Sequence, residues 1–113
     1  MNLIERGEIY YAKLPGTVGS EQNGERPVLI IQNNTGNFYS STTIVAAITS
    51  KLKSNMPTHV YLNNKCLPIN SLALLEQLRT IDKRRLSKYL GKLSKEEMET
   101  IDTALAISVG LSE

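Results

Sequence analysis

The chain has 113 residues, a net charge of +2 and a single cysteine, which predicts one domain over residues 1–113 with a core that needs neither a disulfide nor a metal. The lone Cys66 cannot form an internal disulfide, no apolar stretch approaches the roughly 20 residues that span a bilayer, and the N-terminus has no signal-peptide pattern. These features exclude a disulfide-rich secreted scaffold and a membrane-spanning helix. We therefore expect a cytoplasmic protein with no membrane partner.

The charge is unevenly distributed along the chain. Residues 51–95 carry ten basic and two acidic groups, whereas residues 96–113 carry five acidic groups and no basic one. A segment as basic as residues 51–95 either favours a polyanionic partner such as nucleic acid or is a solvated face of the protein. The charge pattern alone leaves both interpretations open.

The first half of the chain predicts three strands. Residues 8–14 are rich in β-formers and are followed by a Pro-Gly pair. Residues 15–26 form a long segment without helical periodicity, which is typical of a functional loop. Residues 27–32 predict a buried strand that ends in turn-forming residues at 33–37, and the almost wholly apolar residues 43–49 predict a strand buried on both faces.

The second half predicts two further strands. Residues 58–62 alternate between polar or aromatic and apolar side chains, which predicts a half-buried strand. Residues 72–79 fit either a helix or a strand by periodicity. We assign a strand because turn residues precede the segment and the pattern changes directly after it.

Two short helices are expected near the C-terminus. Asp82 is placed to cap the first of them, which would end at Gly91. Ser94 and Glu97 form a capping box for the second, whose shared face consists of Met98, Ile101, Leu105 and Ser108. Five or so strands with short helices predict a mainly β fold, a small antiparallel barrel or strongly bent sheet with helices covering an end and an edge.

Arg26 stands where the long loop meets a buried strand. Pro27 restricts it towards extended geometry, and its planar guanidinium stays charged and matches the geometry of phosphate or carboxylate. Such an arginine either pairs with Glu21 or Glu25 on the surface or binds an anionic ligand. Thr49 gives the apolar strand 43–49 a polar end.

Familiar catalytic and metal-binding motifs are missing from the sequence. There is no paired Cys/His spacing for zinc, no acidic cluster for magnesium, no Gly-rich phosphate loop and no nucleophile elbow. We therefore expect no metal site and no cofactor. The lone His59 is expected to have a structural or surface role, and Cys66 to have no function as a thiol.

Five colinear blocks of the sequence resemble the MazF/PemK family, the toxins of type II toxin–antitoxin modules, which are sequence-specific endoribonucleases. The resemblance runs in register from about Arg6 to about Leu111. The blocks are Arg6-Gly7-Glu8-Ile9-Tyr10-Tyr11-Ala12, Gly19-Ser20-Glu21-Gln22 with Arg26-Pro27-Val28-Leu29-Ile30-Ile31-Gln32-Asn33, Ile44-Val45-Ala46-Ala47-Ile48-Thr49, Pro57-Thr58-His59-Val60, and Leu74-Leu75-Glu76-Gln77-Leu78-Arg79-Thr80-Ile81-Asp82-Lys83.

The resemblance implies a small SH3-like barrel of the MazF/CcdB toxin type that works as a homodimer. It also implies cleavage of single-stranded RNA and inhibition by a cognate antitoxin, for which we expect an acidic, disordered tail. The implied catalytic pair is Arg26 and Thr49, and the implied RNA-binding residues are Gly19, Ser20, Glu21, Gln22 and Gln77. We expect metal-independent cleavage that leaves a 2′,3′-cyclic phosphate and a 5′-hydroxyl, because RNA carries its own nucleophile in the 2′-hydroxyl.

Two other classes of function remain open. A CcdB-like toxin that poisons a protein target would not need an arginine and a threonine at these positions. A non-catalytic RNA-binding module is expected to expose aromatic stacking platforms, and this chain has one phenylalanine, five tyrosines and no tryptophan. Independently of function, a homodimer is expected because several loop hydrophobics should be exposed, namely Leu14, Val18, Phe38, Leu52 and Met56.

Overall fold

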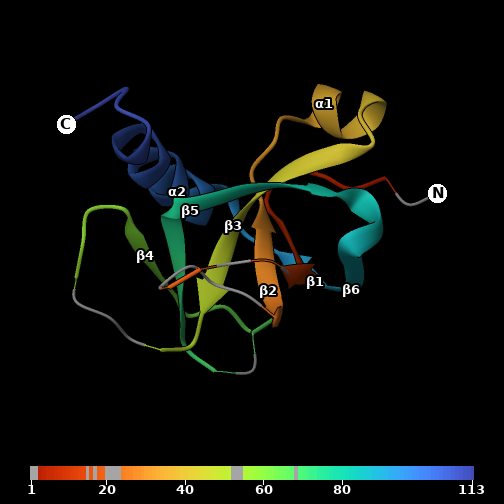
Figure 1. The fold of residues 1–113 in the computed structure, drawn as a ribbon. Coiled ribbons are helices and arrows are strands. Elements are labelled where there is room, and N and C mark those ends of the chain that lie inside the picture. Colours follow the sequence, from red (N-terminus) through yellow and green to blue (C-terminus); the bar gives the residue numbers. More distant parts are fainter. Residues whose placement is uncertain (1–2, 15, 17, 20–23, 52–54, 68) are drawn as a thin grey trace.

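A computed structural model of residues 1–113 describes all of them except 1–2, 15, 17, 20–23, 52–54 and 68. In the described part of the chain, six strands form one sheet, accompanied by two α-helices and a short 3-10 helix (Figure 1). In chain order these are β1 Glu8–Leu14, β2 Gly24–Ile30, α1 Asn34–Tyr39, β3 Thr42–Thr49, β4 His59–Leu62, β5 Ser71–Asp82, the 3-10 helix η1 Lys83–Arg85, β6 Leu86–Lys92 and α2 Lys95–Ser108.

The sheet is antiparallel, with strand order β4-β5-β3-β2-β1-β6. The edge strands are β4 and β6, and Figure 1 shows the sheet strongly twisted between them. The predicted mainly β, antiparallel architecture is confirmed. No helix within the described residues is long and apolar enough to cross a membrane.

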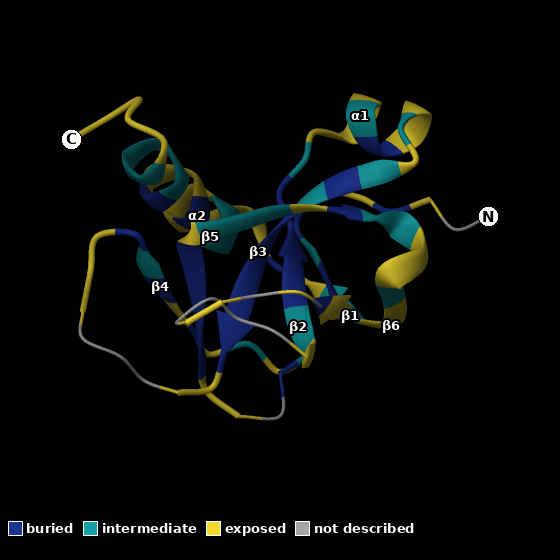
Figure 2. Cartoon of the chain, in the orientation of Figure 1, coloured by how far each residue is buried: buried dark blue, intermediate teal, exposed yellow. Residues whose placement is uncertain are grey.

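Each face of the sheet carries its own hydrophobic cluster. The face that α2 covers, here called the helix face, carries a cluster that includes Leu29, Ile48 and Ile101 of α2. The other face, here called the far face, carries a second cluster that includes Val28 and Val45. Successive residues of a strand divide between the two clusters because side chains alternate across a sheet. The central strands are therefore buried on both sides (Figure 2), as predicted for residues 43–49.

Strand β5 is interrupted by a bulge. Leu78 pairs with Ala46 of β3, whereas Leu74 pairs with the next residue, Ala47, so residues 75–77 have no place in the regular ladder. Leu74 and Leu78 consequently lie on different faces of the sheet, although an uninterrupted strand would put them on the same face.

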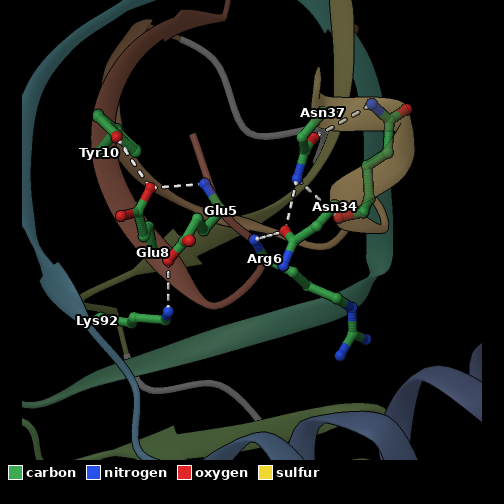
Figure 3. Close-up of polar contacts among 8 residues, drawn as sticks. Glu5, Arg6, Glu8, Tyr10, Asn34, Asn37 and Lys92 are labelled. Atoms are coloured by element: carbon green, nitrogen blue, oxygen red, sulfur yellow. Dashed lines mark hydrogen bonds and ion pairs between the residues drawn. The ribbon is translucent and has the colours of Figure 1, made fainter. Parts of the chain in front are cut away.

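Helix α1 is attached to the sheet by a buried asparagine. Asn37 Nδ2 donates to the Gln32 carbonyl at 2.9 Å, and Asn37 Oδ1 accepts from the Thr43 hydroxyl at 2.8 Å. Figure 3 shows Asn37 beside Asn34, whose Oδ1 accepts the Arg6 backbone amide at 2.7 Å. Polar contacts thus hold this short helix in place.

Helix α2 begins at the predicted capping box. The Ser94 hydroxyl accepts the Glu97 amide at 3.1 Å, and the Glu97 carboxylate accepts the Ser94 amide at 2.8 Å. Ile101 is fully buried against the sheet, and Met98 and Leu105 pack against the same cluster. The predicted apolar face of the helix is confirmed for these three residues.

The predicted helix between Asp82 and Gly91 is wrong. Asp82 caps only η1, and residues 86–92 form β6, which pairs with the free edge of β1. Gly91 serves a close approach rather than a helix end, because a Cβ there would lie 2.5 Å from the Cβ of Cys66. Backbone pairing with β1 outweighs the helical spacing of the apolar residues in this segment.

Three smaller expectations are also corrected. The turn expected at residues 33–37 is the start of α1, with Asn33 as the N-cap. Strand β2 begins at Gly24, so Arg26 lies inside a strand rather than at its boundary. Leu14, expected to be exposed, is buried at the end of β1.

Candidate functional site

Arg26 and Thr49 lie on neighbouring strands. The pairing of β2 with β3 ends at Val28 with Ala47, two residues before Arg26 is reached on β2 and two residues before Thr49 on β3. Val28 lies on the far face, and alternation places Arg26, Thr49 and Ala47 on the same side. The structure therefore places the two residues expected to be catalytic at the same end of the sheet, on neighbouring strands.

The two members of this pair differ in exposure. Thr49 is only 1% exposed, and its Oγ1 accepts a hydrogen bond from the Lys51 backbone amide at 3.2 Å. That bond uses a lone pair and leaves the hydroxyl proton available for donation. Arg26 is half-buried, so it is the member that a ligand arriving from solvent would meet first.

A cleft of about 520 Å³ opens beside the same strand ends. Arg26 and Pro27 contribute to its wall from β2, and Ile48 and Ser50 flank Thr49 along the chain. Thr49 itself is not part of the wall. The cleft is therefore lined by Arg26 and adjoins Thr49.

Gln77 lies in the bulge of β5. Its neighbour Leu78 pairs with Ala46, three residues before Thr49 along β3, which corresponds to about 10 Å along the strand. The structure thus puts Gln77 in the bulge of β5, on the strand that neighbours β3.

The loop residues expected to bind RNA are only partly described. Gly19 has a φ of +63°, in the left-handed region that glycine adopts without strain, and it is exposed. Ser20, Glu21 and Gln22 lie outside the described residues.

A polar cluster that sequence analysis missed joins β4 to the bulge. The Glu76 carboxylate accepts from the Thr58 hydroxyl at 2.9 Å and lies 2.8 Å from His59 Nε2. Burial alone would raise the pKa of Glu76, but hydrogen bonds from its own backbone, His59 and Thr58 outweigh burial and hold the pKa below its ordinary value. One feature of the sequence could have pointed to this cluster, because Thr58, His59 and Glu76 all fall in blocks that carry the family resemblance.

The His59–Glu76 contact gives His59 a structural setting, because its imidazole is almost fully buried. The contact holds His59, the first residue of β4, against Glu76 in the bulge of β5. Within the described residues, no three histidine, cysteine, aspartate or glutamate side chains gather in a group that could hold a metal ion.

Part of the basic segment 51–95 is paired internally. The Arg84 guanidinium donates two hydrogen bonds to the Asp82 carboxylate, at 3.0 and 3.1 Å. Hydrogen bonds from Arg84 lower the pKa of Asp82 to about 2. Lys92 donates to Glu5 at 2.7 Å (Figure 3). The positive charge available to an anionic partner is therefore smaller than the sequence count.

Comparison with known proteins finds one matching family and several similar structures. The family described as PemK-like, MazF-like toxin of type II toxin-antitoxin system matches residues 5–109. An endoribonuclease in complex with its cognate antitoxin, from mycobacterial species, is 27% identical with a TM-score of 0.80, and the match covers 97% of this chain and 98% of that one. MazF from Deinococcus radiodurans is 21% identical with a TM-score of 0.83, over 97% and 99% of the two chains, which shows a shared fold.

Proposed function

Because the chain belongs to the PemK-like, MazF-like toxins of type II toxin–antitoxin systems, we propose that it is an endoribonuclease that cuts single-stranded RNA. The proposal rests on the position of Arg26 and Thr49 at the same end of the neighbouring strands β2 and β3, in a chain of this family. The similar mycobacterial protein, itself an endoribonuclease, supports the assignment.

The chemistry needs little equipment because RNA supplies the nucleophile. Attack of the 2′-hydroxyl oxygen on phosphorus forms a 2′,3′-cyclic phosphate and expels the 5′-oxygen, which takes up a proton and leaves as a 5′-hydroxyl. The protein must stabilise the negative charge on the phosphoryl oxygens and assist two proton transfers. This reaction has no step that requires a metal ion.

Arg26 is suited to the charge on the phosphoryl oxygens. Its fixed cation and planar donors stabilise charge that develops in the transition state, which is usually the largest single catalytic contribution. We do not assign it as the base, because a guanidinium does not give up its proton readily. Thr49 has a hydroxyl proton with which to orient the phosphate or relay a proton.

The experiment is incubation of the purified protein with a long single-stranded RNA, with and without EDTA, followed by mapping of the product ends. We expect defined cuts with cyclic phosphate and 5′-hydroxyl ends that persist in EDTA. Intact RNA would refute the nuclease and favour a CcdB-like poison or a non-catalytic binding module. Activity that EDTA abolishes and magnesium restores would refute the metal-independent mechanism.

Thr49 has its own matched test. Thr49→Val keeps the size of this buried side chain but removes the hydroxyl, whereas Thr49→Ser keeps the hydroxyl. We expect slower cleavage by Thr49→Val and near-normal cleavage by Thr49→Ser, with both variants folded by circular dichroism. Equal cleavage rates for the two variants would show that the Thr49 hydroxyl takes no part in the reaction.

We also propose a homodimer. Val18, Phe38 and Met56 are exposed, as expected for apolar residues at an interface between copies. Leu14 is buried and gives no support, and Leu52 lies outside the described residues. Sedimentation at micromolar concentration should give twice the 12.5 kDa of the chain, and a monomer would contradict the proposal.

The proposed regulator is a cognate antitoxin with an acidic, disordered tail. The mycobacterial relative is bound to its cognate antitoxin, and the basic residues of segment 51–95 other than Arg84 and Lys92 complement such a tail. RNA and antitoxin should then compete, with both affinities falling as salt rises and that of RNA falling more steeply. A ternary complex with undiminished RNA affinity would show that the antitoxin acts elsewhere.

A further inference from the structure

A row of paired residues continues from the Arg26–Thr49 pair to the edge of the sheet. Thr49 pairs with Leu72 of β5, and Leu72 pairs with Tyr61 of β4. Paired residues in antiparallel strands point to the same face of the sheet, so all four side chains belong to the far face. Thr49 and Tyr61 are two strand spacings apart, or about 10 Å.

Tyr61 is exposed while its chain neighbours are not. Val60 and Leu62 are buried in the helix-face cluster, which directs Tyr61 to the other side of β4. There the side chain is 54% exposed. Among the described residues, no other aromatic ring packs against it. A large aromatic ring thus lies open to solvent on the face of the candidate catalytic pair.

The strand that carries Tyr61 is anchored on the same face. His59 precedes Tyr61 by two residues, pairs with Leu74 and contacts the Glu76 carboxylate at 2.8 Å. Backbone pairing and this side-chain contact fix the position of the Tyr61 backbone and the face of β4 from which its ring projects. A ring that projects from a fixed strand costs less to order when a flat ligand stacks on it than one on a mobile loop.

We propose that Tyr61 stacks on a base of the RNA next to the phosphate held by Arg26, an inference that rests on the proposed nuclease function. Unpaired bases in single-stranded RNA expose flat faces that stack on tyrosine, and the buried Leu72 provides an apolar floor between the tyrosine and the pair. Tyr61 is then an RNA-binding residue that favours well-stacking bases at one position beside the cut.

The test measures binding of single-stranded RNA in which fluorine replaces every 2′-hydroxyl. This RNA lacks the nucleophile, so the full chain can be studied with Arg26 and Thr49 intact. Tyr61→Ala should weaken binding roughly 5- to 150-fold, the range for loss of one base–aromatic stack, whereas Tyr61→Phe, which keeps the ring, should bind nearly as well as the unaltered protein. Tyr39→Ala is the matched control, because Tyr39 is 80% exposed in α1, beyond the opposite end of β3.

A second measurement locates the stacked base. The fluorescent base 2-aminopurine is placed at successive positions of the same RNA, and stacking on tyrosine should quench it at one position. We expect Tyr61→Ala to lose that quenching and Tyr39→Ala to keep it.

Several outcomes would overturn the inference. Tyr61→Ala binding as tightly as the unaltered protein would refute it, and Tyr61→Phe behaving like Tyr61→Ala would mean that the hydroxyl acts instead of the ring. Loss of antitoxin binding or of dimerisation, with RNA affinity unchanged, would assign Tyr61 to a protein interface. Failure to cut ordinary RNA refutes the proposed function separately, because the binding measurements do not depend on cleavage.

Discussion

The two faces of the sheet are organised differently. On the helix face, many apolar side chains from β2, β3, β5 and α2 share one cluster, so the fold depends on their combined burial. On the far face near the ends of β2 and β3, single residues with distinct chemistry stand at positions set by strand register. Substitutions should therefore affect mainly stability on the helix face and mainly RNA cleavage or binding at this end of the far face.

The largest expected effect is on the helix face. Ile101→Ala removes a fully buried side chain where α2 meets the sheet and should lower the free energy of unfolding by about 2–5 kcal/mol. Urea denaturation measures this loss, and cleavage per folded molecule should not change. Leu111→Ala is the control, because Leu111 is exposed beyond the end of α2. Equal stability of the two variants would contradict the comparison.

The next effect is on the far face. Arg26→Ala should slow cleavage by about 10²- to 10³-fold through loss of a charge-stabilising donor, with little change in the unfolding free energy of this half-buried residue. Single-turnover cleavage and urea denaturation together separate the two effects. Arg84→Ala removes an exposed arginine of η1 whose guanidinium is already paired with Asp82, and this variant should cut normally. Full cleavage activity of the Arg26→Ala protein would show that Arg26 is not a catalytic residue.

A smaller effect is expected at the start of α2. Ser94→Ala removes one half of the capping box and should cost about 1 kcal/mol of stability, without altering the rate of cleavage. Ser94→Asp restores a capping oxygen and should recover most of the loss. A Ser94→Asp protein as unstable as Ser94→Ala would show that the cap does not act through this acceptor.

The smallest effect tests the polar cluster at the bulge. The pKa of Glu76 lies below its ordinary value of 4.5, so the stabilisation from its contacts is present above about pH 4.5 and is lost as pH falls through the lower, folded-state pKa. Glu76→Gln should lower the unfolding temperature slightly at pH 7, by the equivalent of less than about 1 kcal/mol for a partly exposed pair. Thermal unfolding from pH 7 to pH 3 should show this difference shrinking in acid. A difference in unfolding temperature that grows in acid would contradict this prediction, because it would mean that folding raises the pKa of Glu76.

Local sequence signals predicted a large part of the fold. The limits of β1, the apolar run of β3 and the Ser94–Glu97 capping box each follow from residues close together in the chain, and each is confirmed. Strand β6 was not predictable in this way, because its apolar residues have helical spacing and only the free edge of β1 makes it a strand.

The candidate site was only partly predictable for the same reason. Arg26 and Thr49 were singled out by their places in the sequence and by the family resemblance, but their position at the same end of neighbouring strands follows from the pairing of β2 with β3. The contact of His59 with Glu76 and the alignment of Tyr61 with Thr49 depend on pairings between distant segments. Periodicity within one segment carries no information about such pairings.

The bulge at residues 75–77 restricts which changes in chain length the protein can tolerate. The residues after it, Leu78 to Ile81, alternate in the opposite phase from those before it. Insertion or deletion of one residue here would exchange the partners of the two faces, turning Arg79 towards α2 and Leu78 away from it. In a lineage of such genes, this segment should vary by substitution while its length stays constant, whereas the surface loops between strands are free to lengthen or shorten.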